Sequence, residues 1–492
     1  MVLLPLCFSL TAAAQEQRTI EVQVKGAQGD TLYLANYVGN KLFYADTAVA
    51  DAQGMAVFAR EKGYRAGVYA LVAPGPEYFE FIVNEPVIEL TTSKSDLKGD
   101  LKVVRSVENE RFIAYIRYLD EQRQRLDQVR GERERTMDPI KKSALEERLR
   151  ELNEEVLAYQ KDLVEKDPSS LVSRIVRMSL AVELETPRTV TGEVDSVAAY
   201  YQYRDHFWDN TDLTDPVNTR VPVFANKLEE YITKVIPQVP DTINHYTDRL
   251  IAQLGDDPDL YRYVVHFVTY TYETSDIMGM DAVFVHMAKN YYCPKVDGSP
   301  KAFWLKDEQL KKVCERADKM APLVIGSLAA PLVLPDTTEE RWISSHDLPQ
   351  EYVVLCFWDP HCGHCKKELP ILNEVYHQRL KGMDVEVYAV AKATDSLLFN
   401  DWRDLIVEHK LDWVNVGLTW HVFDEAKRDP RRFIPALTTI ESLNYAETYD
   451  VYSTPKVFVL DGDRRIVGKQ LSPDQIADLI ERLRAKGSTP GG

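Results

Sequence analysis

Two cysteines, Cys362 and Cys365, are separated only by Gly363 and His364 in the stretch FWDPHCGHCKKELP. A C-x-x-C pair can close a small disulfide ring with little rearrangement, which a reversible two-electron couple requires. The pair follows the apolar run YVVLCFW and precedes a segment with helical periodicity. These residues therefore predict thiol–disulfide exchange at a strand-to-helix junction.

The two cysteines have different predicted roles because they occupy different positions relative to the helix. Cys362 lies at the helix start, where free backbone N–H groups and the helix dipole favour a thiolate, so we expect it to be the nucleophile. Cys365 lies one turn inside the helix, and we expect it to be shielded and to resolve a mixed disulfide. A partly protonated imidazole at His364 would favour the thiolate further and stabilise the reduced form.

Other uses of a C-x-x-C pair fit these residues less well. Structural zinc needs four ligands, usually from two such pairs, and the sequence has no second C-x-x-C. His361 and His364 are too close to the cysteines in sequence to surround one ion with them. Haem attachment needs a histidine where Lys366 stands. A structural disulfide would be unusual in an α/β core but stays open. We expect no metal and no organic cofactor, only a redox-active disulfide, Cys362–Cys365.

Strands and helices alternate in the part of the chain that contains the cysteines. The sequence predicts strands at 352–358, 385–392, 451–461 and 465–471, and helices at 366–381, 397–409 and 473–486. Such alternation indicates an α/β layer structure with parallel strand pairs. Residues 419–447 make a longer connection than these units need, which suggests an insertion near the active face.

The stretch VVLCFWDPHCGHCKKELP resembles the active-site segment of the thioredoxin superfamily. The resemblance is strongest to the exported thiol:disulfide oxidoreductases of the TlpA/ResA type, with their F-W-x-x-x-C-x-x-C-K-x-E-x-P pattern, and it covers about residues 321–488. Pro370 matches the proline that kinks the family's active-site helix. Thr454 and Pro455 match the cis-proline step that faces the cysteines and pairs with an extended substrate chain. The resemblance implies that the substrate groove is shaped by Trp358, His361, Thr454 and Pro455.

Two features complicate this resemblance. Cys356 stands where thioredoxins have a buried aspartate that helps to move the proton of the second cysteine. Glu368 is the candidate for this proton transfer, with water or a slow resolving step as alternatives. We interpret Cys356 as a buried strand residue, and its exchange with the couple stays open. The Gly-His dipeptide is typical of protein disulfide isomerase, near −180 mV against about −270 mV for thioredoxin, whereas TlpA/ResA-like proteins are mostly reductases. The direction of electron flow therefore stays open.

Two further domains are predicted upstream of this region. Residues 18–105 alternate with period two in short runs separated by Gly, Asp, Asn and Pro, which predicts an all-β, sandwich-like domain. Residues 106–320 have helical periodicity and begin with a hairpin that turns at the sequence TMDP. A β-rich domain, a helical domain and a thioredoxin-like domain at 321–488 resemble, in this order, Bacteroidetes-type envelope proteins.

The first residues and the charge indicate the compartment. Residues 1–17 contain an apolar stretch of signal-peptide length followed by Ala12-Ala13-Ala14, and the stretch is too short to span a membrane. The formal charge of −18 argues against nucleic acid or an anionic membrane as a partner. Together with the resemblance, these features predict a protein without a transmembrane segment in the periplasm or cell envelope of a Gram-negative bacterium.

The combined prediction is an exported thiol–disulfide oxidoreductase that reduces, forms or isomerises disulfides in envelope proteins. Its expected partners are protein thiols and disulfides and an upstream electron donor or acceptor. Two other classes stay open: a peroxiredoxin-like peroxidase, although the P-x-x-x-T-x-x-C signature is absent before Cys362, and a non-catalytic binding protein with a structural disulfide. Cys293 and Cys314 are candidates for a second disulfide, but spacing alone does not bring their Cα atoms within about 7 Å.

Overall fold

The computed structural model describes residues 18–75, 77–294 and 301–487. The predicted signal peptide, residues 1–17, lies outside the described residues. The chain divides into two compact units, one made of the residues up to Gln238 with His245–Val264, the other of Val239–Asn244 with the residues from Val265 onward. The helical region therefore contributes to both units.

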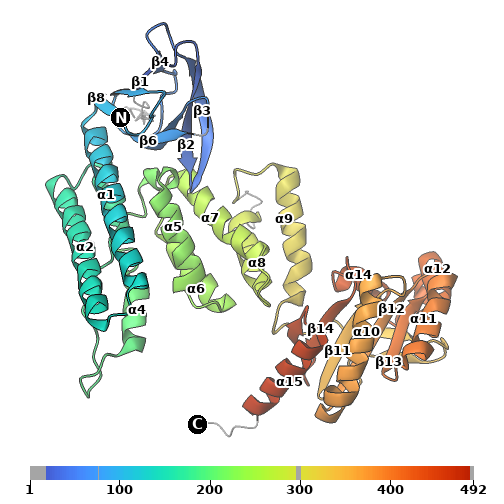
Figure 1. Cartoon of the computed structure of the whole chain (residues 1–492). Helices are drawn as coiled ribbons and strands as arrows, with labels where there is room; N and C mark the ends of the chain where they lie inside the picture. The colour runs from blue at the N-terminus through green and yellow to red at the C-terminus, as the bar shows by residue number, and fades with distance from the viewer. Residues whose placement is uncertain (1–17, 76, 295–300, 488–492) are drawn as a thin grey trace, which may run out of the picture. The chain divides into compact units, whose positions relative to one another are not determined.

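The first unit begins with two four-stranded sheets, of order β4-β1-β7-β8 and β3-β2-β5-β6 (Figure 1). Ile20, Val22 and Val24 alternate with exposed or half-buried residues along β1, which is the period-two pattern of a half-buried strand. Both sheets contribute to one core, which confirms the all-β prediction. The strands are β1 (Thr19–Lys25), β2 (Thr31–Val38), β3 (Lys41–Val49), β4 (Met55–Phe58), β5 (Gly67–Val72), β6 (Tyr78–Val83), β7 (Val87–Ser93) and β8 (Lys102–Arg105).

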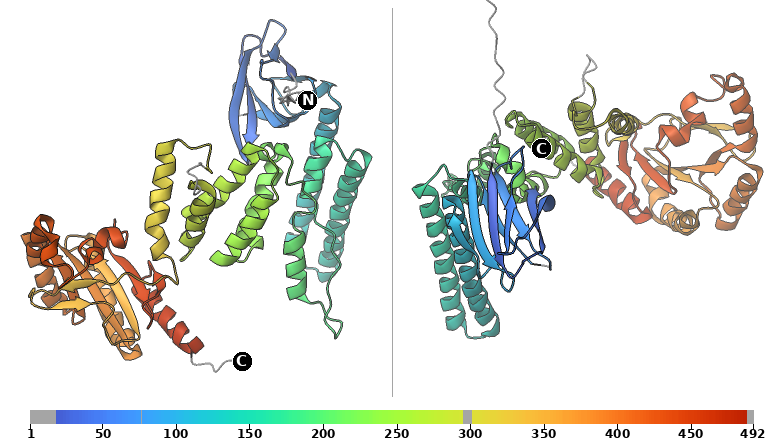
Figure 2. Two further views of the ribbon diagram at one scale, coloured as in Figure 1. Left: turned by 180° about the vertical axis from the view of Figure 1, so that it is seen from behind. Right: turned by 90° about the horizontal axis from the view of Figure 1, so that it is seen from above.

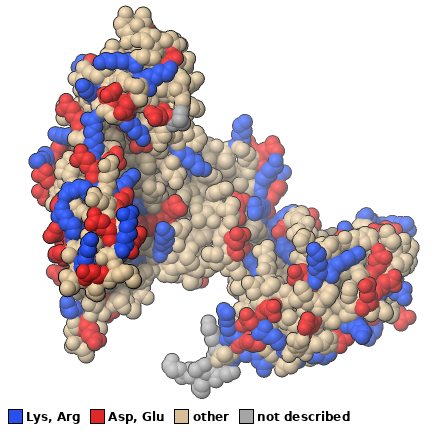
Figure 3. All heavy atoms as spheres, viewed as in Figure 1, with Lys and Arg blue, Asp and Glu red and all other residues tan. Residues whose placement is uncertain are grey.

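The predicted helical hairpin is formed by α1 (Val107–Arg135) and α2 (Pro139–Lys166). The turn between them ends where Asp138 caps α2, and its side chain accepts a hydrogen bond from the Ile140 N–H. Lys, Arg, Asp and Glu are interspersed on the surface of the hairpin (Figure 3), and ion pairs such as Arg133–Glu146, at 2.8 Å, join the two helices. Such exposed pairs add little stability individually.

The remaining helices of the helical region are short. They are α3 (Leu171–Ser179), α4 (Ser196–His206), α5 (Pro222–Glu230), α6 (Pro240–Ala252), α7 (Pro258–Glu273), α8 (Asp281–Met287) and α9 (Asp307–Met320). No helix in the described part of the chain is long and apolar enough to cross a membrane.

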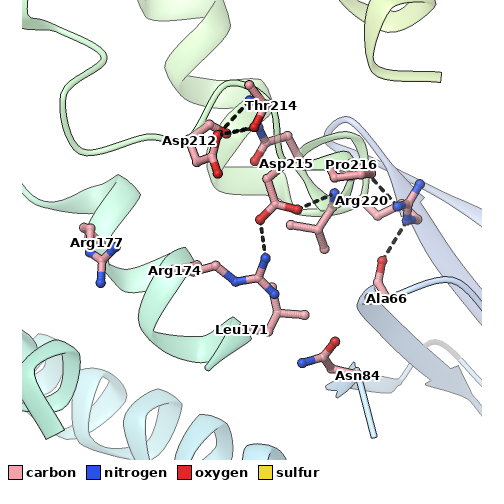
Figure 4. A network of polar contacts seen from close by, with 12 residues as sticks. Ala66, Asn84, Leu171, Arg174, Arg177, Asp212, Thr214, Asp215, Pro216 and Arg220 are labelled. Atoms are coloured by element: carbon pink, nitrogen blue, oxygen red, sulfur yellow. Dashed lines mark hydrogen bonds and ion pairs between the residues drawn. The ribbon is translucent and has the colours of Figure 1, made fainter. Parts of the chain in front are cut away.

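A buried arginine joins the sheets of the first unit to its helical part (Figure 4). Arg220 is 8% exposed, and its guanidinium donates hydrogen bonds to the carbonyls of Ala66 and Pro216, each at 2.7 Å. Burial lowers the pKa of Arg220 because the charged form loses hydration. Nearby, Arg174 forms an ion pair with Asp215. These contacts supply partners to charges that would otherwise be costly to bury.

The second unit contains a five-stranded sheet of order β13-β12-β11-β14-β15. Its strands are β11 (Tyr352–Trp358), β12 (Val385–Ala393), β13 (Val414–Thr419), β14 (Lys456–Leu460) and β15 (Ile466–Lys469). The first three are mutually parallel, whereas β14 is antiparallel to both β11 and β15. Every residue of β11 is buried, as expected for a central strand covered on both faces.

Helices cover both faces of this sheet (Figure 2). One core contains side chains from α10 (Gly363–Val375), α11 (Ser396–His409) and α15 (Pro473–Gly487). The opposite core contains side chains from α12 (Trp420–Arg428), α14 (Tyr445–Thr448) and the short strand β9 (Val333–Pro335). This α/β architecture is thioredoxin-like, and the predicted three-part fold class is confirmed.

Two details of the predicted sheet are wrong. The strand expected at 451–461 begins only at Lys456, because Pro455 has no N–H to donate to a ladder. Strand β13 is absent from the sequence-based prediction, although VNVGLT alternates apolar and polar residues with period two. The predicted insertion at 419–447 contains α12 and α13 (Ile440–Leu443).

Cys293 and Cys314 form a disulfide, with their Cα atoms 5.7 Å apart. The bond joins Cys293, the residue after the short π-helix η3 (Ala288–Tyr292), to Cys314 in the middle of α9. The candidate pairing from the sequence is therefore present in the structure.

Candidate active site

Cys362 and Cys365 lie where the chain leaves β11 and enters α10. Cys362 is the N-cap residue of α10, and its Sγ accepts a hydrogen bond from the Cys365 N–H at 3.4 Å. Cys362 is partly exposed and Cys365 is fully buried, and both are free thiols in this structure. The first sulfur therefore faces the outside, and the second lies beneath it.

Asp359 holds the turn that precedes Cys362. Its carboxylate accepts a hydrogen bond from the His361 N–H at 2.8 Å, and its carbonyl accepts one from the Cys362 N–H at 2.9 Å. The same carboxylate pairs with Lys392 of β12 at 3.0 Å. Sequence analysis did not single out Asp359, although an aspartate before a proline is a common turn signal. Its contacts fix the position of Cys362 relative to the sheet.

The loop before β14 faces the cysteines from a distant part of the chain. The Thr454–Pro455 peptide bond is cis, as the resemblance implies. The Thr454 carbonyl oxygen lies 3.2 Å from the Cys362 Sγ, so the thiol can donate a hydrogen bond to it. Thr454 and Pro455 line a cavity of about 370 Å³ together with His364 and Glu368. A substrate chain that lies along this loop would reach the exposed sulfur.

The environment of Cys362 favours its thiolate. Burial alone would raise its pKa, but hydrogen bonds from the Thr454 side chain and from the backbone N–H groups of Cys365 and His364 outweigh burial, and the pKa is lowered. A lowered pKa increases the fraction of the nucleophilic form near neutral pH. Cys362 therefore has the exposure and the electrostatics of an attacking thiol.

The other two free thiols of the C-terminal domain are held protonated. Burial raises the pKa of Cys365 to about 12, and the neighbouring Cys362 also raises it, although hydrogen bonds from Asp359 and Thr454 act in the opposite direction. Burial, with a smaller contribution from Cys365, raises the pKa of Cys356 to about 12. Of the three thiols, only Cys362 has a lowered pKa.

His364 contributes to the site through its backbone. Its side chain is exposed and lines the cavity beside Pro455, whereas its N–H stabilises the Cys362 thiolate. Among the described residues, no hydrogen bond joins the His364 imidazole to either cysteine. The hydrogen bond from His364 that lowers the pKa of Cys362 thus comes from the main chain, and the effect expected from the imidazole stays a prediction.

The His361 side chain lies against α11, whereas the resemblance implies that it lies in the substrate groove. Its Nε2 lies 2.6 Å from the Asp401 carboxylate of α11, and both side chains are exposed. It does not line the cavity that contains Thr454 and Pro455. The partner Asp401, 40 residues along the chain, has no local sequence signal that would identify it.

Trp358 does not line the substrate groove, so this assignment is corrected. Its side chain is 1% exposed and packs in the same core as Cys365. Residues of β11 alternate between the two faces of the sheet, and Trp358 lies on the face covered by α10. It supports the active-site helix from inside.

Glu368 and Cys356 border the same cavity, the one beside Thr454 and Pro455. Glu368 is half-buried in α10, one turn after Cys365, whereas Cys356 is 1% exposed on β11. The interpretation of Cys356 as a buried strand residue is confirmed. The carboxyl group of Glu368 therefore borders the cavity next to the buried part of the site.

Residues 325–468 match the AhpC/TSA family. The chain carries a thioredoxin-like domain at its C-terminal end. A comparison with curated proteins found no match.

Several solved structures from Bacteroidetes are similar to parts of the chain. The thioredoxin domain of a Bacteroides vulgatus thiol-disulfide oxidoreductase is 25% identical over 32% of this chain and 97% of its own, with a TM-score of 0.26. A domain of a "possible thiol-disulfide isomerase" from Cytophaga hutchinsonii is 27% identical over 35% of this chain and 99% of its own, with a TM-score of 0.27. A thioredoxin-like protein from Bacteroides caccae is 15% identical over 62% of this chain and 99% of its own, with a TM-score of 0.37.

Proposed function

We propose that this protein is a thiol–disulfide oxidoreductase that acts through Cys362 and Cys365. The observation that carries the proposal is the contrast between the two sulfurs. Cys362 is partly exposed, has a lowered pKa and lies against the Thr454 carbonyl, whereas Cys365 is buried and has a pKa raised to about 12. A nucleophile that attacks first and a protected thiol that attacks second need this arrangement.

The chemistry is two successive thiol–disulfide exchanges. The Cys362 thiolate attacks one sulfur of a substrate disulfide, so a Cys362–substrate bond forms, the substrate S–S bond breaks, and the other substrate sulfur leaves as a thiolate that takes a proton. Cys365 then loses its proton and attacks the Cys362 Sγ, which releases the second substrate thiol. The substrate gains two electrons, and the protein becomes the Cys362–Cys365 disulfide.

The second step needs a proton acceptor because the Cys365 thiol is protonated at neutral pH. Glu368 is the candidate expected from the sequence, and it borders the cavity beside Thr454 and lies one turn from Cys365 in α10. We propose that Glu368 accepts this proton through water in the cavity. In the reverse direction, the same group would return the proton to Cys365.

Within this class, we place the protein with the exported TlpA/ResA-type oxidoreductases of Gram-negative envelopes. The support is the spacing of the motif from Phe357 to Pro370 and the signal-like character of residues 1–17. Its substrates would then be disulfides or thiols of envelope proteins, supplied with electrons by a separate donor or relieved of them by an acceptor.

The test is the reduction potential of the Cys362–Cys365 couple, measured by equilibrating the purified protein in glutathione buffers. A value near −180 mV would assign disulfide formation or isomerisation, and one near or below about −270 mV would assign reduction. The matched control is Cys356→Ser, which leaves the couple intact. A protein without a reversible two-electron transition would be a binding protein with a structural disulfide, and peroxide consumption without a thiol partner would indicate a peroxidase.

A further inference from the structure

A second cavity, of about 740 Å³, lies beside the Thr454–Pro455 loop in the second unit. One wall comes from the helical region, including Ile277 and Met278 of the loop between α7 and α8, and Lys319 of α9. The other wall comes from the thioredoxin-like domain and includes Tyr452 and Gln470. Its volume is in the range of ligand pockets, about 300–1,000 Å³.

This cavity continues the candidate active site. Gln470 lines both it and the 370 Å³ cavity that contains Thr454 and Pro455. Tyr452 and Lys456, which stand on either side of the Thr454–Pro455 step in sequence, line the larger cavity. A chain paired with the Thr454 backbone and extended toward Tyr452 would therefore enter this space.

Specific contacts hold the helical wall against the thioredoxin-like domain. Lys469 of β15 forms an ion pair with Asp281 of α8, and these side chains are only 11% and 18% exposed. The Lys469 ammonium also donates to the Leu323 carbonyl at 3.0 Å. Lys319 donates to the Tyr452 hydroxyl at 2.9 Å. These contacts join the helical wall to the thioredoxin-like domain within the second unit.

The walls carry both charged and apolar side chains, and ion pairs neutralise many of the charges. Ile277, Met278 and Tyr452 are 57%, 40% and 72% exposed. Lys456 pairs with Asp450 at 3.2 Å, as Lys469 does with Asp281. Exposed apolar side chains that lie together on a surface mark a site of interaction more often than scattered ones do. Recognition here would depend on apolar contact and on backbone hydrogen bonds.

We propose that this cavity is a substrate subsite that receives the polypeptide segment next to the reacting cysteine of a protein substrate. The inference rests on the proposed function. The segment lies extended along residues 452–456 and places an apolar side chain against Ile277, Met278 and Tyr452. The helical region of the second unit therefore selects among the disulfides that Cys362 attacks, and small disulfides, which end at the exposed sulfur, do not use it.

The test compares Ile277→Asp with the unmodified protein on three disulfides. Two are octapeptides whose central cysteine is in a mixed disulfide with glutathione, one flanked by leucine and valine and the other by serine. The third is bis(2-hydroxyethyl) disulfide. We expect kcat/KM for the apolar peptide, divided by that for the small disulfide, to fall about tenfold in Ile277→Asp, the size of effect that a lost apolar contact produces. Met278→Asp should act in the same direction.

The matched control is Val407→Asp, a substitution at a 77% exposed position of α11 outside both cavities. This variant should leave the ratio unchanged. An unchanged ratio in both Ile277→Asp and Met278→Asp would overturn the subsite while leaving the proposed function intact. If the unmodified protein exchanges none of the three disulfides, the proposed function itself fails. A steep fall of kcat/KM for the apolar peptide between about 50 and 500 mM salt would show that the peptide is recognised by charge and not by apolar contact, which would overturn the inference.

Discussion

The second unit contains two cysteine pairs that are placed in opposite ways. Cys362 and Cys365 are two residues apart at a helix N-terminus and are free thiols. Cys293 and Cys314 are 21 positions apart and form a disulfide. This bond links the end of the π-helix η3 to the interior of α9. The first pair faces a loop that a substrate can reach, whereas the second closes a loop of its own chain.

The two pairs differ in what surrounds each sulfur. Hydrogen bonds from Thr454, Cys365 and His364 stabilise the thiolate of Cys362 and thus the reduced form. Cys314 lies in the body of α9, where backbone N–H groups are already bonded within the helix. Under the proposed function, local backbone geometry around the sulfur, as well as the spacing of the cysteines, therefore distinguishes the proposed redox couple from the disulfide.

The largest expected effect is on activity, which should depend on the Cys362–Cys365 pair and not on the Cys293–Cys314 pair. Cys362→Ser should reduce exchange with bis(2-hydroxyethyl) disulfide by at least about a thousandfold, because a serine hydroxyl at its free pKa is a weak nucleophile. The double variant Cys293→Ser/Cys314→Ser should keep most of this activity, measured as thiol release. Full activity of the Cys362→Ser variant would show that another residue is the nucleophile and would overturn the proposed function.

The second effect separates the pairs by stability. Closing a loop of about 20 residues stabilises a protein by about 3 kcal/mol in the chain-entropy account, so Cys293→Ser/Cys314→Ser should lower the unfolding free energy of the second unit by about this amount. Chemical denaturation followed by tryptophan fluorescence measures it. Cys356→Ser, at a buried thiol without a disulfide, serves as the comparison. Equal midpoints for the double variant and the unmodified protein would assign no structural role to this disulfide.

The smallest effect concerns the thiolate alone. Thr454→Val removes a side-chain hydrogen bond that lowers the pKa of Cys362, so the pKa of Cys362 should rise in this variant. Because the pKa of Cys362 rises, a smaller fraction of its side chains is in the thiolate form at pH 7. Alkylation by iodoacetamide is therefore slower at pH 7 and recovers at higher pH.

Thr438→Val, which removes a hydroxyl bonded to the Val333 carbonyl away from the cysteines, controls for the loss of a threonine. Its alkylation profile should match that of the unmodified protein. Cys365, with a pKa raised to about 12, should stay unmodified in the folded protein throughout the pH range. Identical profiles for Thr454→Val and the unmodified protein would exclude the Thr454 side chain as a support of the thiolate.

Much of this arrangement was predictable from short stretches of sequence. Seven consecutive apolar or aromatic residues predicted β11 with its exact bounds, Tyr352–Trp358, because a strand covered on both faces has no polar positions. The C-x-x-C pair after it predicted the place of Cys362 at the start of α10, because a helix that follows such a strand exposes its first N–H groups there. Strand β13 was missed although Val414, Val416 and Leu418 recur at period two, because the alternation covers only six residues and its polar positions are asparagine, glycine and threonine.

The sequence by itself determined the order of the all-β, helical and α/β parts, the position of the C-x-x-C pair between a strand and a helix, and the burial of Cys356. Only the tertiary structure decided that Trp358 packs inside, that His361 turns toward Asp401, that Cys293 and Cys314 form a disulfide, and that α8 and α9 make a second wall beside Thr454. The physical reason is range: periodicity and helix dipoles act over a few neighbouring residues, whereas these contacts join residues 21 to about 180 positions apart, which only the packing of the whole unit brings together.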